Sequence, residues 1–508
     1  MSSRYTLAID QGTTNTKVVA VDQDGSIAAV ASERVSLWFP QPGWVESDPT
    51  AIWKSVVSAI EGCLAQLEDP EPEVVAIGVC NQRESVVMWD RATGRPLRPM
   101  VSWQCTRGRE VCDGLDDPET RSMVAERTGL GLEPMFSAPK MKWLLDSILD
   151  GSARAAQGEI CIGTVDSWLV WQLTRGHAFV TDFTNASRTL LFNLEDLSWD
   201  AGLLDLFGVP EAALPEVQAS SAPHGVCSGA ELNPLLHGVV IGAILGDSHA
   251  ALVGHGAFRP GRIKASFGTG TSVLAPTDEI SACDGLSSTV AWSRTDGETV
   301  EVCYAIEGNI YATGAALEWT AELLGMGHDV GELEQLAMTC EDSRGVVFVP
   351  AFAGLGAPHW DAHARALVTG ITFGAGRAEL ARATFEAVAH QVADVVDRTA
   401  SALSPERLRI HADGGAARSD LLSRLVADLS DVELLRSDDA ETAAVGAAHF
   451  AGLTAGIWPT LGDLAQLPRR VTRVTPTMNG SVRREARNRW AEALDRSSSR
   501  SRSGADLR

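Results

Sequence analysis

The chain has 508 residues, with 42 Lys and Arg residues against 66 Asp and Glu residues and a formal net charge of −24. This charge disfavours binding to nucleic acid, which requires a cationic surface against the phosphates. No run of about 18 apolar residues is present, which argues against a membrane-spanning protein. With 45% hydrophobic residues, the composition excludes general disorder. At about 150 residues per domain, the length predicts two to four domains.

The amino-terminal residues and the cysteines indicate a cytoplasmic protein. The first residues, MSSRYTLAIDQG, lack a basic segment followed by an apolar one, so we expect no secretion signal. The nine Cys residues contain no CxxC pair, a pattern typical of reduced, buried thiols rather than of disulfides or zinc ligands.

The first 80 residues have the pattern of an antiparallel meander followed by a helix and a buried strand. The turn after the first strand is the DQGTT sequence, and Asp24-Gly25 is a strong hairpin signal. Strands are expected at residues 5–9, 17–21, 26–31 and 74–79, and a helix at residues 50–67. This alternation predicts a layered α/β domain.

A similar pattern recurs after the midpoint of the chain. A GTGT turn separates two expected strands, and Asp296-Gly297 marks another hairpin. Strands are expected at residues 239–244, 263–267, 272–275, 289–293 and 299–306. The repeated meander predicts a diverged duplication of one α/β fold. We therefore expect domains at residues 1–254 and 255–496, and a disordered tail at residues 497–508, which lack apolar periodicity.

The first Gly-Thr turn carries groups suited to phosphate. Gly12 lets the backbone approach a ligand closely. Asp10 is suited to hold Mg²⁺ through water, and Lys17 would add a cation beside the loop. The hydroxyl, amide and N–H donors of the loop come from Thr13, Thr14 and Asn15.

A second loop, Gly268-Thr269-Gly270, has the same character. Two such turns facing one cleft would hold a polyphosphate from both sides, and no Walker-type GxxxxGK[ST] sequence is present. A further strand is expected to end at Asp413-Gly414-Gly415, before a helix at residues 419–429. Gly415 would let a flat ring pack against the backbone there.

Nine motifs together resemble the FGGY family of carbohydrate kinases, and glycerol kinases in particular. They occur in the order IDQGTT, NQRES, WQC, KMKW, GTVDSWLVWQLT, TDFTNASRTLLFN, GTGT, AFAGLGAPHWD and ADGGA. The resemblance extends over residues 5–490. It implies two duplicated actin-like ATPase domains, each of RNase H-like α/β topology, around a central cleft. It also implies a cytoplasmic kinase that uses ATP and Mg²⁺ and forms a homo-oligomer, either a dimer or a tetramer.

The resemblance assigns one set of residues to the nucleotide. It places Asp10 at the metal and the nucleoside beside Gly314, Gly415 and Ser419. Lys17 replaces the Arg common in glycerol kinases, which keeps the charge but loses the guanidinium fork. Ser419 stands where these enzymes often have Asn. The phosphate-binding residues expected are Thr13, Thr14, Asn15, Lys17, Gly268, Thr269 and Gly270.

The resemblance also implies a polyol site made of Arg83, Glu84, Trp103 and Asp247. Adjacent hydroxyls need donors and acceptors, which Arg83 and Glu84 supply side by side at the end of a strand. The ring of Trp103 would pack against the C–H face of the substrate. Asp247 is expected to act as general base, because it would orient a terminal hydroxyl and accept its proton as the bond to phosphorus forms.

Three pocket residues differ from the usual glycerol kinase pattern. Met135 stands where Tyr is usual, Ser248 where Gln is usual, and Ser272 where Phe is usual. The loss of two aromatic walls should widen the pocket and weaken a small ligand by about 1–3 kcal/mol. We therefore expect a longer or differently oxidised polyol to be preferred over glycerol. His249 is a candidate to replace the missing amide, and a structural histidine is the alternative.

The expected function is ATP-dependent phosphorylation of a terminal hydroxyl of glycerol or a related small polyol. The nearest alternative is a kinase of the same family that acts on pentuloses, pentitols or tetritols. A non-catalytic regulator that responds to nucleotide or polyol is disfavoured by Asp247, because a binder needs no base. An actin-like or chaperone-like ATPase is disfavoured by the polyol residues. No nucleic-acid or membrane partner is expected.

Overall fold

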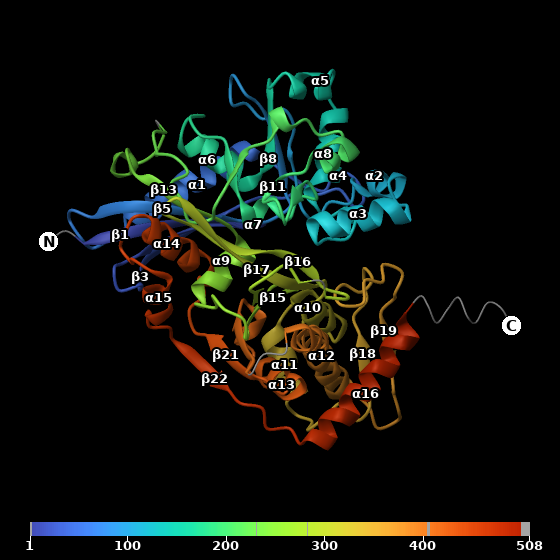
Figure 1. Ribbon diagram of the computed structural model, residues 1–508. Helices are drawn as coiled ribbons and strands as arrows, with labels where there is room; N and C mark the ends of the chain where they lie inside the picture. Colours follow the sequence, from blue (N-terminus) through green and yellow to red (C-terminus); the bar gives the residue numbers. More distant parts are fainter. Residues whose placement is uncertain (1–2, 230, 282, 404–406, 499–508) are drawn as a thin grey trace.

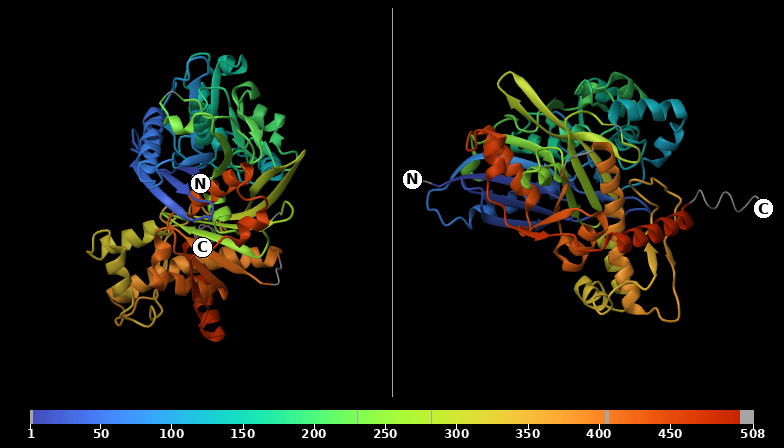
Figure 2. Two further views of the ribbon diagram at one scale, coloured as in Figure 1. Left: turned by 90° about the vertical axis from the view of Figure 1, so that its left-hand side faces the viewer. Right: turned by 60° about the horizontal axis from the view of Figure 1, so that its bottom comes forward.

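Two large β-sheets, one from each half of the chain, form the framework of the protein (Figure 1). The computed structural model describes residues 3–229, 231–281, 283–403 and 407–498. In Figure 1 the first half, blue to green, lies above the second half, yellow to red. The left view of Figure 2, turned by 90°, shows the two halves still one above the other.

The first sheet contains the meander predicted from the sequence. Its strands are β1 (Arg4–Gln11), β2 (Asn15–Val21), β3 (Ile27–Arg34), β5 (Glu73–Asn81) and β13 (Val240–Gly246). Their order is β13-β5-β1-β2-β3, in which β1, β2 and β3 pair antiparallel while β5 and β13 run parallel to β1. Gly25 closes the turn before β3 with φ at 80°, a conformation that favours glycine.

The second sheet repeats this arrangement and adds a strand at each edge. It is built from β14 (Arg262–Phe267), β15 (Thr271–Thr277), β16 (Ser287–Asp296), β17 (Thr299–Ile310), β20 (Arg409–Asp413), β21 (Glu433–Ser437) and β22 (Val471–Val474). The order β17-β15-β14-β20-β21 matches β3-β2-β1-β5-β13, with the same antiparallel and parallel pairs. The predicted duplication of an α/β fold is confirmed.

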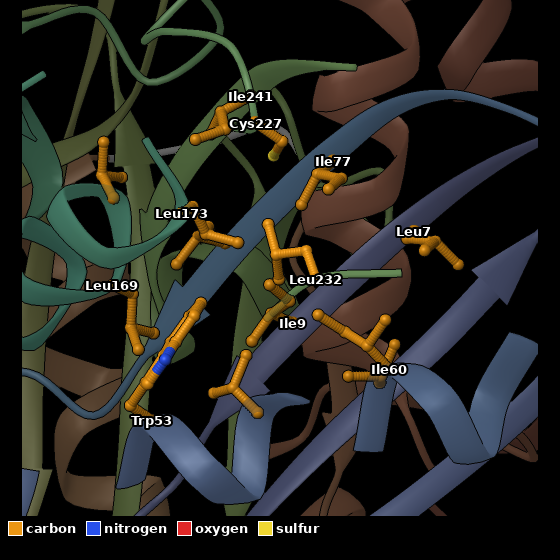
Figure 3. Packing of buried hydrophobic residues seen from close by; sticks show 14 of the residues in the cluster. Leu7, Ile9, Trp53, Ile60, Ile77, Leu169, Leu173, Cys227, Leu232 and Ile241 are labelled. Carbon is orange, nitrogen blue, oxygen red and sulfur yellow. The ribbon is translucent and has the colours of Figure 1, made fainter. Parts of the chain in front are cut away.

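Helix α1 (Pro49–Leu64) covers one face of the first sheet. The side chain of Asp48 caps the helix by accepting the N–H of Thr50. Ile52, Val56 and Ile60 recur at a spacing of four and are all buried, so they form the face that meets the sheet. Figure 3 shows this core, with labels on Leu7, Ile9, Trp53, Ile60, Ile77, Leu169, Leu173, Cys227, Leu232 and Ile241.

A smaller sheet and several helices complete the first half. The sheet has the order β4-β7-β6-β8 and consists of β4 (Glu46–Ser47), β6 (Val86–Asp90), β7 (Met100–Val101) and β8 (Ile160–Thr164). The helices are α2 (Arg109–Gly114), α3 (Pro118–Thr128), α4 (Ser137–Asp146), α5 (Gly151–Ala156), α6 (Val165–Leu173), α7 (Phe183–Ala186) and α8 (Ala201–Phe207).

The second half carries its own helices. Among the residues that the structure describes, three short two-stranded pairings also occur. The helices around the second sheet are α10 (Gly314–Leu323), α11 (Val330–Ala337), α12 (Arg377–Leu403), α13 (Asp420–Ser430) and α15 (Leu461–Gln466). The short pairs are β9 (Val180–Asp182) with β12 (Glu216–Gln218), β10 (Phe192–Asn193) with β11 (Ser198–Trp199), and β18 (Val347–Val349) with β19 (Leu367–Thr369).

Helices α9 (Asp247–Gly254) and α14 (Thr442–Thr454) lie together between the two sheets, in a buried cluster that contains residues of both halves. Their close approach depends on small residues. A Cβ at Gly446 would lie 1.8 Å from the carbonyl oxygen of Ala250, and a Cβ at Gly78 would lie 2.3 Å from that of Ala447. Helix α14 therefore packs on the first sheet although it follows β21 in the chain, as Figure 1 shows.

Helix α16 (Gly480–Ser497) corrects the predicted start of the tail. Ser497 is its last residue, is 1% exposed, and donates its hydroxyl to the carbonyl of Arg365 at 2.7 Å. The prediction of disorder is wrong at this residue, because the helix that buries Trp490 continues through it. Residues 499–508 of the predicted tail lie outside the described residues. Within the described ranges, no helix is long and apolar enough to cross a membrane.

Candidate active site

Residues from both halves line one cleft of about 710 Å³. They follow the carboxyl ends of β1, β5 and β13 in the first sheet and of β14 and β20 in the second, where ligands of parallel α/β sheets bind. Of the expected site residues, the cleft is lined by Asp10, Thr13, Lys17, Arg83, Glu84, Trp103, Met135, Asp247, Ser248, Gly268, Thr269, Gly270 and Ser272. As far as the described residues define its wall, the wall does not include Thr14, Asn15, Gly314, Gly415 or Ser419.

The first Gly-Thr loop is a tight turn between β1 and β2. Gly12 donates its N–H to the carbonyl of Asn15 at 2.9 Å, and the Asn15 amide donates to Thr14 Oγ1 at 3.2 Å. The hydroxyl of Thr13 accepts the indole N–H of Trp103 at 3.0 Å. This bond joins the expected phosphate loop to the expected substrate wall.

Lys17 forms an ion pair with Glu441, the residue that precedes α14. Its Nζ donates to Oε1 at 2.9 Å and to Oε2 at 2.7 Å. Both residues line the cleft, and the side chain of Lys17 is 32% exposed. The cation expected to meet phosphate is therefore shared with a carboxylate. Sequence reasoning missed Glu441, because only the packing of α14 on the first sheet brings it here.

The second Gly-Thr loop is supported from behind by the start of α10. Gly268 donates its N–H to the carbonyl of Gly270 at 2.9 Å, and Gly314 donates its N–H to the carbonyl of Gly268 at 3.0 Å. A Cβ at residue 314 would lie 2.7 Å from that carbonyl oxygen, so a glycine is required for this approach. Gly314 therefore shapes the loop and does not line the cleft itself.

The other two of the three residues expected near the nucleoside, Gly415 and Ser419, differ in their surroundings. A Cβ at Gly415 would have no atom within 4 Å, so the backbone there borders open space. Ser419 caps α13: its Oγ accepts the N–H of Leu422 at 3.0 Å and donates to Glu334 Oε1 at 2.7 Å. Its hydroxyl is thus engaged in structural contacts away from the cleft wall.

Arg83 and Glu84 follow β5 in a strained turn. Glu84 has φ at 61°, a left-handed conformation that costs free energy in residues other than glycine and often marks a functional site. Arg83 lies between two carboxylates. Its Nη1 donates to Glu307 Oε1 at 2.7 Å, and its Nε is 3.5 Å from Asp247 Oδ1. The pairing fixes the guanidinium beside the cleft.

Two buried residues outside the predicted set, Arg188 and Glu307, continue the network of charged side chains around Arg83. Glu307 on β17 binds Arg83 through one oxygen and Arg188 through the other, and Arg188 Nε donates to Glu84 Oε1 at 2.7 Å. Burial alone would raise the pKa of Glu307, but Arg188 and Arg83 hold it well below its usual range. The available signal for Glu307 was an acidic residue directly after the expected strand of residues 299–306, which in the structure continues to Ile310.

Asp247 is the first residue of α9 and follows β13 directly. Its side chain is 41% exposed to the cleft, and its Oδ1 accepts the N–H of Ser248 at 2.6 Å. The surrounding protein raises the pKa of this carboxyl by limiting its hydration, and Arg83 opposes that rise. A carboxylate with a raised pKa is a better proton acceptor for an alcohol than an ordinary one.

The three positions that differ from glycerol kinases lie on the cleft wall. The hydroxyl oxygens of Ser248 and Ser272 are 2.7 Å apart, and Met135 presents a flexible thioether in place of an aromatic ring. Two aromatic residues outside the predicted set, Tyr311 and Trp360, line the cleft from the second half. Their rings are 6.4 Å apart with an interplanar angle of 76°.

His249 lies behind the cleft wall instead of on it. The side chain is fully buried, and its Nε2 is 3.5 Å from Thr289 Oγ1. Burial lowers the pKa of the imidazole well below its usual range, so the ring is neutral. This position matches the alternative of a structural histidine.

The carboxyl of Asp10 has the electrostatic character expected of a metal residue. Burial and the neighbouring Asp247 raise its pKa to about 7, and Lys17 opposes that rise. A carboxyl whose pKa is raised by a neighbouring carboxylate suits a divalent cation, because the cation relieves the repulsion between the two charges. In the described part of the chain, no three His, Cys, Asp or Glu side chains form a metal-binding group. Mg²⁺ needs only one or two carboxylates when phosphates and water complete its shell, so the donors present fit it.

Family models and known proteins agree with this architecture. The N-terminal domain of the FGGY family of carbohydrate kinases matches residues 5–254, and the C-terminal domain of the same family matches residues 263–455. An apulose kinase of Pectobacterium atrosepticum is 44% identical, over 96% of this chain and 97% of that protein. A glycerol kinase of Shewanella sp. strain MR-7 is 40% identical, over 98% of this chain and 100% of that protein.

A solved structure extends the agreement to three dimensions. The crystal structure of Plasmodium falciparum glycerol kinase with ADP superposes with a TM-score of 0.90. The two sequences are 30% identical, and the match covers 98% of each chain. The duplicated sheets, the cleft between them and these matches lead to one conclusion: the chain belongs to the FGGY family of carbohydrate kinases.

Proposed function

We propose that this ATP-dependent carbohydrate kinase phosphorylates a terminal hydroxyl of a small polyol or sugar. The observation that carries the proposal is that one cleft holds both Gly-Thr loops together with Arg83, Glu84 and Asp247. The loops suit a polyphosphate, and the three charged side chains suit adjacent hydroxyls.

In the proposed reaction, Arg83 and Glu84 position the substrate hydroxyls and Asp247 accepts a proton. Transfer of a phosphoryl group passes through a loose transition state, so positioning contributes more than the strength of the base. Asp247 Oδ1 would orient the attacking oxygen and take its proton late, as the bond to phosphorus forms. Closure of the two halves would exclude water and limit the hydrolysis of ATP.

Backbone groups and few cations hold the nucleotide in this proposal. The Thr13 and Thr269 loops contribute N–H and hydroxyl donors, while Lys17 supplies a cation shared with Glu441. We propose that Asp10 holds Mg²⁺ through water. That ion would neutralise charge on the phosphates of the nucleotide.

A pentulose or related sugar is a second candidate substrate, favoured by two observations. Ser248, Ser272 and Met135 leave the cleft without the bulk that Gln, Phe and Tyr would provide at these positions. The relative at 44% identity is named an apulose kinase, whereas the glycerol kinase described above is 40% identical. Both favour a substrate larger than glycerol.

A panel of polyols and ketoses with three to six carbons tests the proposal. ADP release coupled to a colour reaction gives kcat/KM for each compound in the presence of ATP and Mg²⁺. We expect phosphorylation of at least one compound, with glycerol behind a larger one. A clear preference for glycerol would defeat the argument from pocket width. ATP turnover independent of every compound would instead favour an ATPase, and no turnover would favour a regulator.

We also propose a cytoplasmic location and a homo-oligomer, either a dimer or a tetramer. Nine free Cys residues, most of them buried, suit a reducing compartment. The oligomer rests on the resemblance to glycerol kinases. Light scattering after size-exclusion chromatography tests it, and a mass near 54 kDa would overturn it.

A further inference from the structure

A second hollow, of about 960 Å³, lies at the opposite end of the second sheet from the cleft. Its wall comes from the segment before β14, the end of β15, the hairpin of β16 and β17, and α15. Arg262 begins β14 in this hollow, whereas Gly268 of the cleft follows the last residue of the same strand. With six residues, the strand places roughly 20 Å between the two sites. As far as the described residues define both walls, the hollow and the cleft share no lining residue.

Two arginines flank a tight turn in this hollow. Pro260 and Gly261 occupy the centre of the turn, and Gly261 has φ at 85°. Proline before a glycine of positive φ is the pattern of a type II turn, which holds the flanking Cα atoms within about 7 Å of each other. Arg259 and Arg262 are the flanking residues, and both line the hollow. The turn therefore brings two guanidinium groups to one space.

These two guanidinium groups lack an acidic partner. Among the residues that the structure describes, neither forms an ion pair, and Arg262 Nη1 lies 3.5 Å from the imidazole of His411. A third arginine of the wall, Arg294, is by contrast bound to Glu301 at 2.5 Å. The chain has 66 acidic residues against 42 basic ones, so carboxylates are not scarce. Like charges held close together repel each other, and an anion between them removes that cost.

The surroundings of the turn are cationic. Arg469 lies behind the wall, since a Cβ at Gly256 would be 2.8 Å from its Cζ. Its guanidinium donates to main-chain carbonyls at 2.7 to 3.4 Å, and within the described ranges no carboxylate pairs with it. Burial lowers the pKa of His411 well below its usual range, and nearby cations that include Arg262 and Arg469 lower it further. Against these cations the wall sets Asp278, at an exposed position.

Part of the wall is aromatic. Phe258 and Trp292 line the hollow and are almost fully buried, with rings 6.2 Å apart at an interplanar angle of 89°. Small-molecule sites typically combine such apolar surface with a few placed charges, in about 300–1,000 Å³. The hollow has both features and a volume in this range.

We propose that the hollow binds a small organic anion, with its carboxylate or phosphate group held by Arg259 and Arg262 and its apolar ring packed on Phe258 and Trp292. A guanidinium group matches either kind of anion with two parallel N–H donors. The site goes beyond the proposed kinase function and does not depend on it.

Titration with three fluorinated probes tests the proposal. 4-Fluorophenyl phosphate and 4-fluorobenzoate carry the two kinds of anion, and 4-fluorobenzyl alcohol is their neutral counterpart. Fluorine NMR gives Kd for each probe, with ADP and Mg²⁺ in excess so that no probe competes for the phosphate loops of the cleft. We expect Kd for the better anion to be at least about tenfold below that for the alcohol. The order of the two anions identifies the phosphate or the carboxylate as the preferred group.

Variants of the two arginines locate the binding. Arg259→Met and Arg262→Met should each raise Kd for the better anion by at least about tenfold, because each removes a charged pair of donors. Arg259→Lys keeps the charge but loses the planar fork, so its effect should be smaller. Arg424→Met is the matched control, since Arg424 is exposed on α13 and lines neither the hollow nor the cleft. There Kd should stay within about twofold.

Three results would overturn the proposal: equal affinity for the alcohol and the better anion, a Kd that neither arginine variant changes, or no binding of any probe at millimolar concentration. Arg259 is exposed and unpaired in the described part of the chain, so its variant decides the question if Arg262→Met does not fold. Phosphorylation of polyols or sugars is measured separately, so failure of the anion site leaves the proposed function standing.

Discussion

Arg188 and Glu307 form an ion pair in which neither side chain has exposed surface, with Nη1 and Oε2 2.5 Å apart. The pair joins the segment after α7 to β17 of the second sheet, and so connects the two halves behind the cleft. Arg188→Met would leave Glu307 with Arg83 as its cationic partner. Loss of one partner of a buried pair costs about 3–5 kcal/mol, so the free energy of unfolding in urea should fall by that amount.

The stability lost in Arg188→Met should depend on pH, because it comes from the charge of Glu307. The pKa of Glu307 lies below its usual 4.5 in the folded protein, so the stability from its charge is present above pH 4.5 and is lost as the pH falls. The effect of Arg188→Met should therefore be largest near pH 7 and shrink in acid. Arg489→Met is the control: that exposed residue pairs with Glu485 one turn away, and its loss should cost under about 0.5 kcal/mol. Equal effects of the two variants would contradict the prediction.

Local signals in the sequence were sufficient to predict the framework and both loops. Alternating apolar residues and the Gly25 hairpin define the meander, because strand pairing across a tight turn depends on neighbours in the chain. Glu307 and Glu441 escaped prediction for the opposite reason. Each reaches the site through contacts between segments far apart in sequence, and the small residues of α14 do not indicate which sheet that helix covers.

Ser419 illustrates a different limit. Its position in the motif order suggested a nucleoside contact, yet the same hydroxyl is a good helix cap, and in the structure it caps α13 and binds Glu334. One residue type can serve either role, and only the tertiary arrangement distinguishes them. The start of the predicted tail, residues 497–508, likewise depends on tertiary contacts, since helix α16 includes Ser497.

Asp247→Asn should remove most of the turnover and little of the binding. The amide keeps the shape of the side chain but cannot accept the substrate proton, so kcat should fall by about 10²–10⁴-fold. Substrate affinity measured by calorimetry should stay within about tenfold. Asp196→Asn is the control, because Asp196 is exposed and does not line the cleft. Near-normal kcat in Asp247→Asn would rule out the base assignment.

Restoring bulk to the cleft should move the substrate preference toward glycerol. Combining Ser248→Gln with Ser272→Phe fills space that a larger substrate would occupy, and packs against a three-carbon ligand. The ratio of kcat/KM for glycerol to that for the best larger substrate should rise by at least about tenfold, within the range that close packing contributes. An unchanged ratio would show that pocket width does not set the preference.

Lys17 and Glu441 provide a test of nucleotide binding. Glu441→Gln frees the Lys17 ammonium and removes a negative charge beside the proposed phosphate site, so KM for ATP should fall by about two- to fivefold, as a partly exposed pair allows. Lys17→Met should raise the same constant. Lys54→Met, on the exposed side of α1, is the control and should leave it unchanged. A higher KM for ATP in Glu441→Gln would mean that this carboxylate itself supports the nucleotide.

The raised pKa of Asp10 predicts that the free energy of unfolding of the ligand-free protein falls as the pH rises. Its pKa is about 7 in the folded state and 3.8 as the ordinary value, so the folded protein holds this proton more tightly than the unfolded chain. The stability from that proton is fully present below pH 3.8 and is lost as the pH rises through about 7. Asp10→Asn removes the charge, so its gain in Tm over wild type should grow between pH 4 and pH 7 and then level off.

Addition of Mg²⁺ and ATP should reverse this advantage at pH 8. A divalent cation near Asp10 stabilises the ionised carboxylate of the wild type, and the amide of Asp10→Asn cannot reproduce that interaction. Thermal unfolding at pH 8 should therefore show a larger rise in Tm for wild type than for the variant, and the variant should lose most of its turnover. Equal shifts in Tm for the two proteins would place the metal elsewhere, because a carboxylate that holds the ion through water must contribute to its binding.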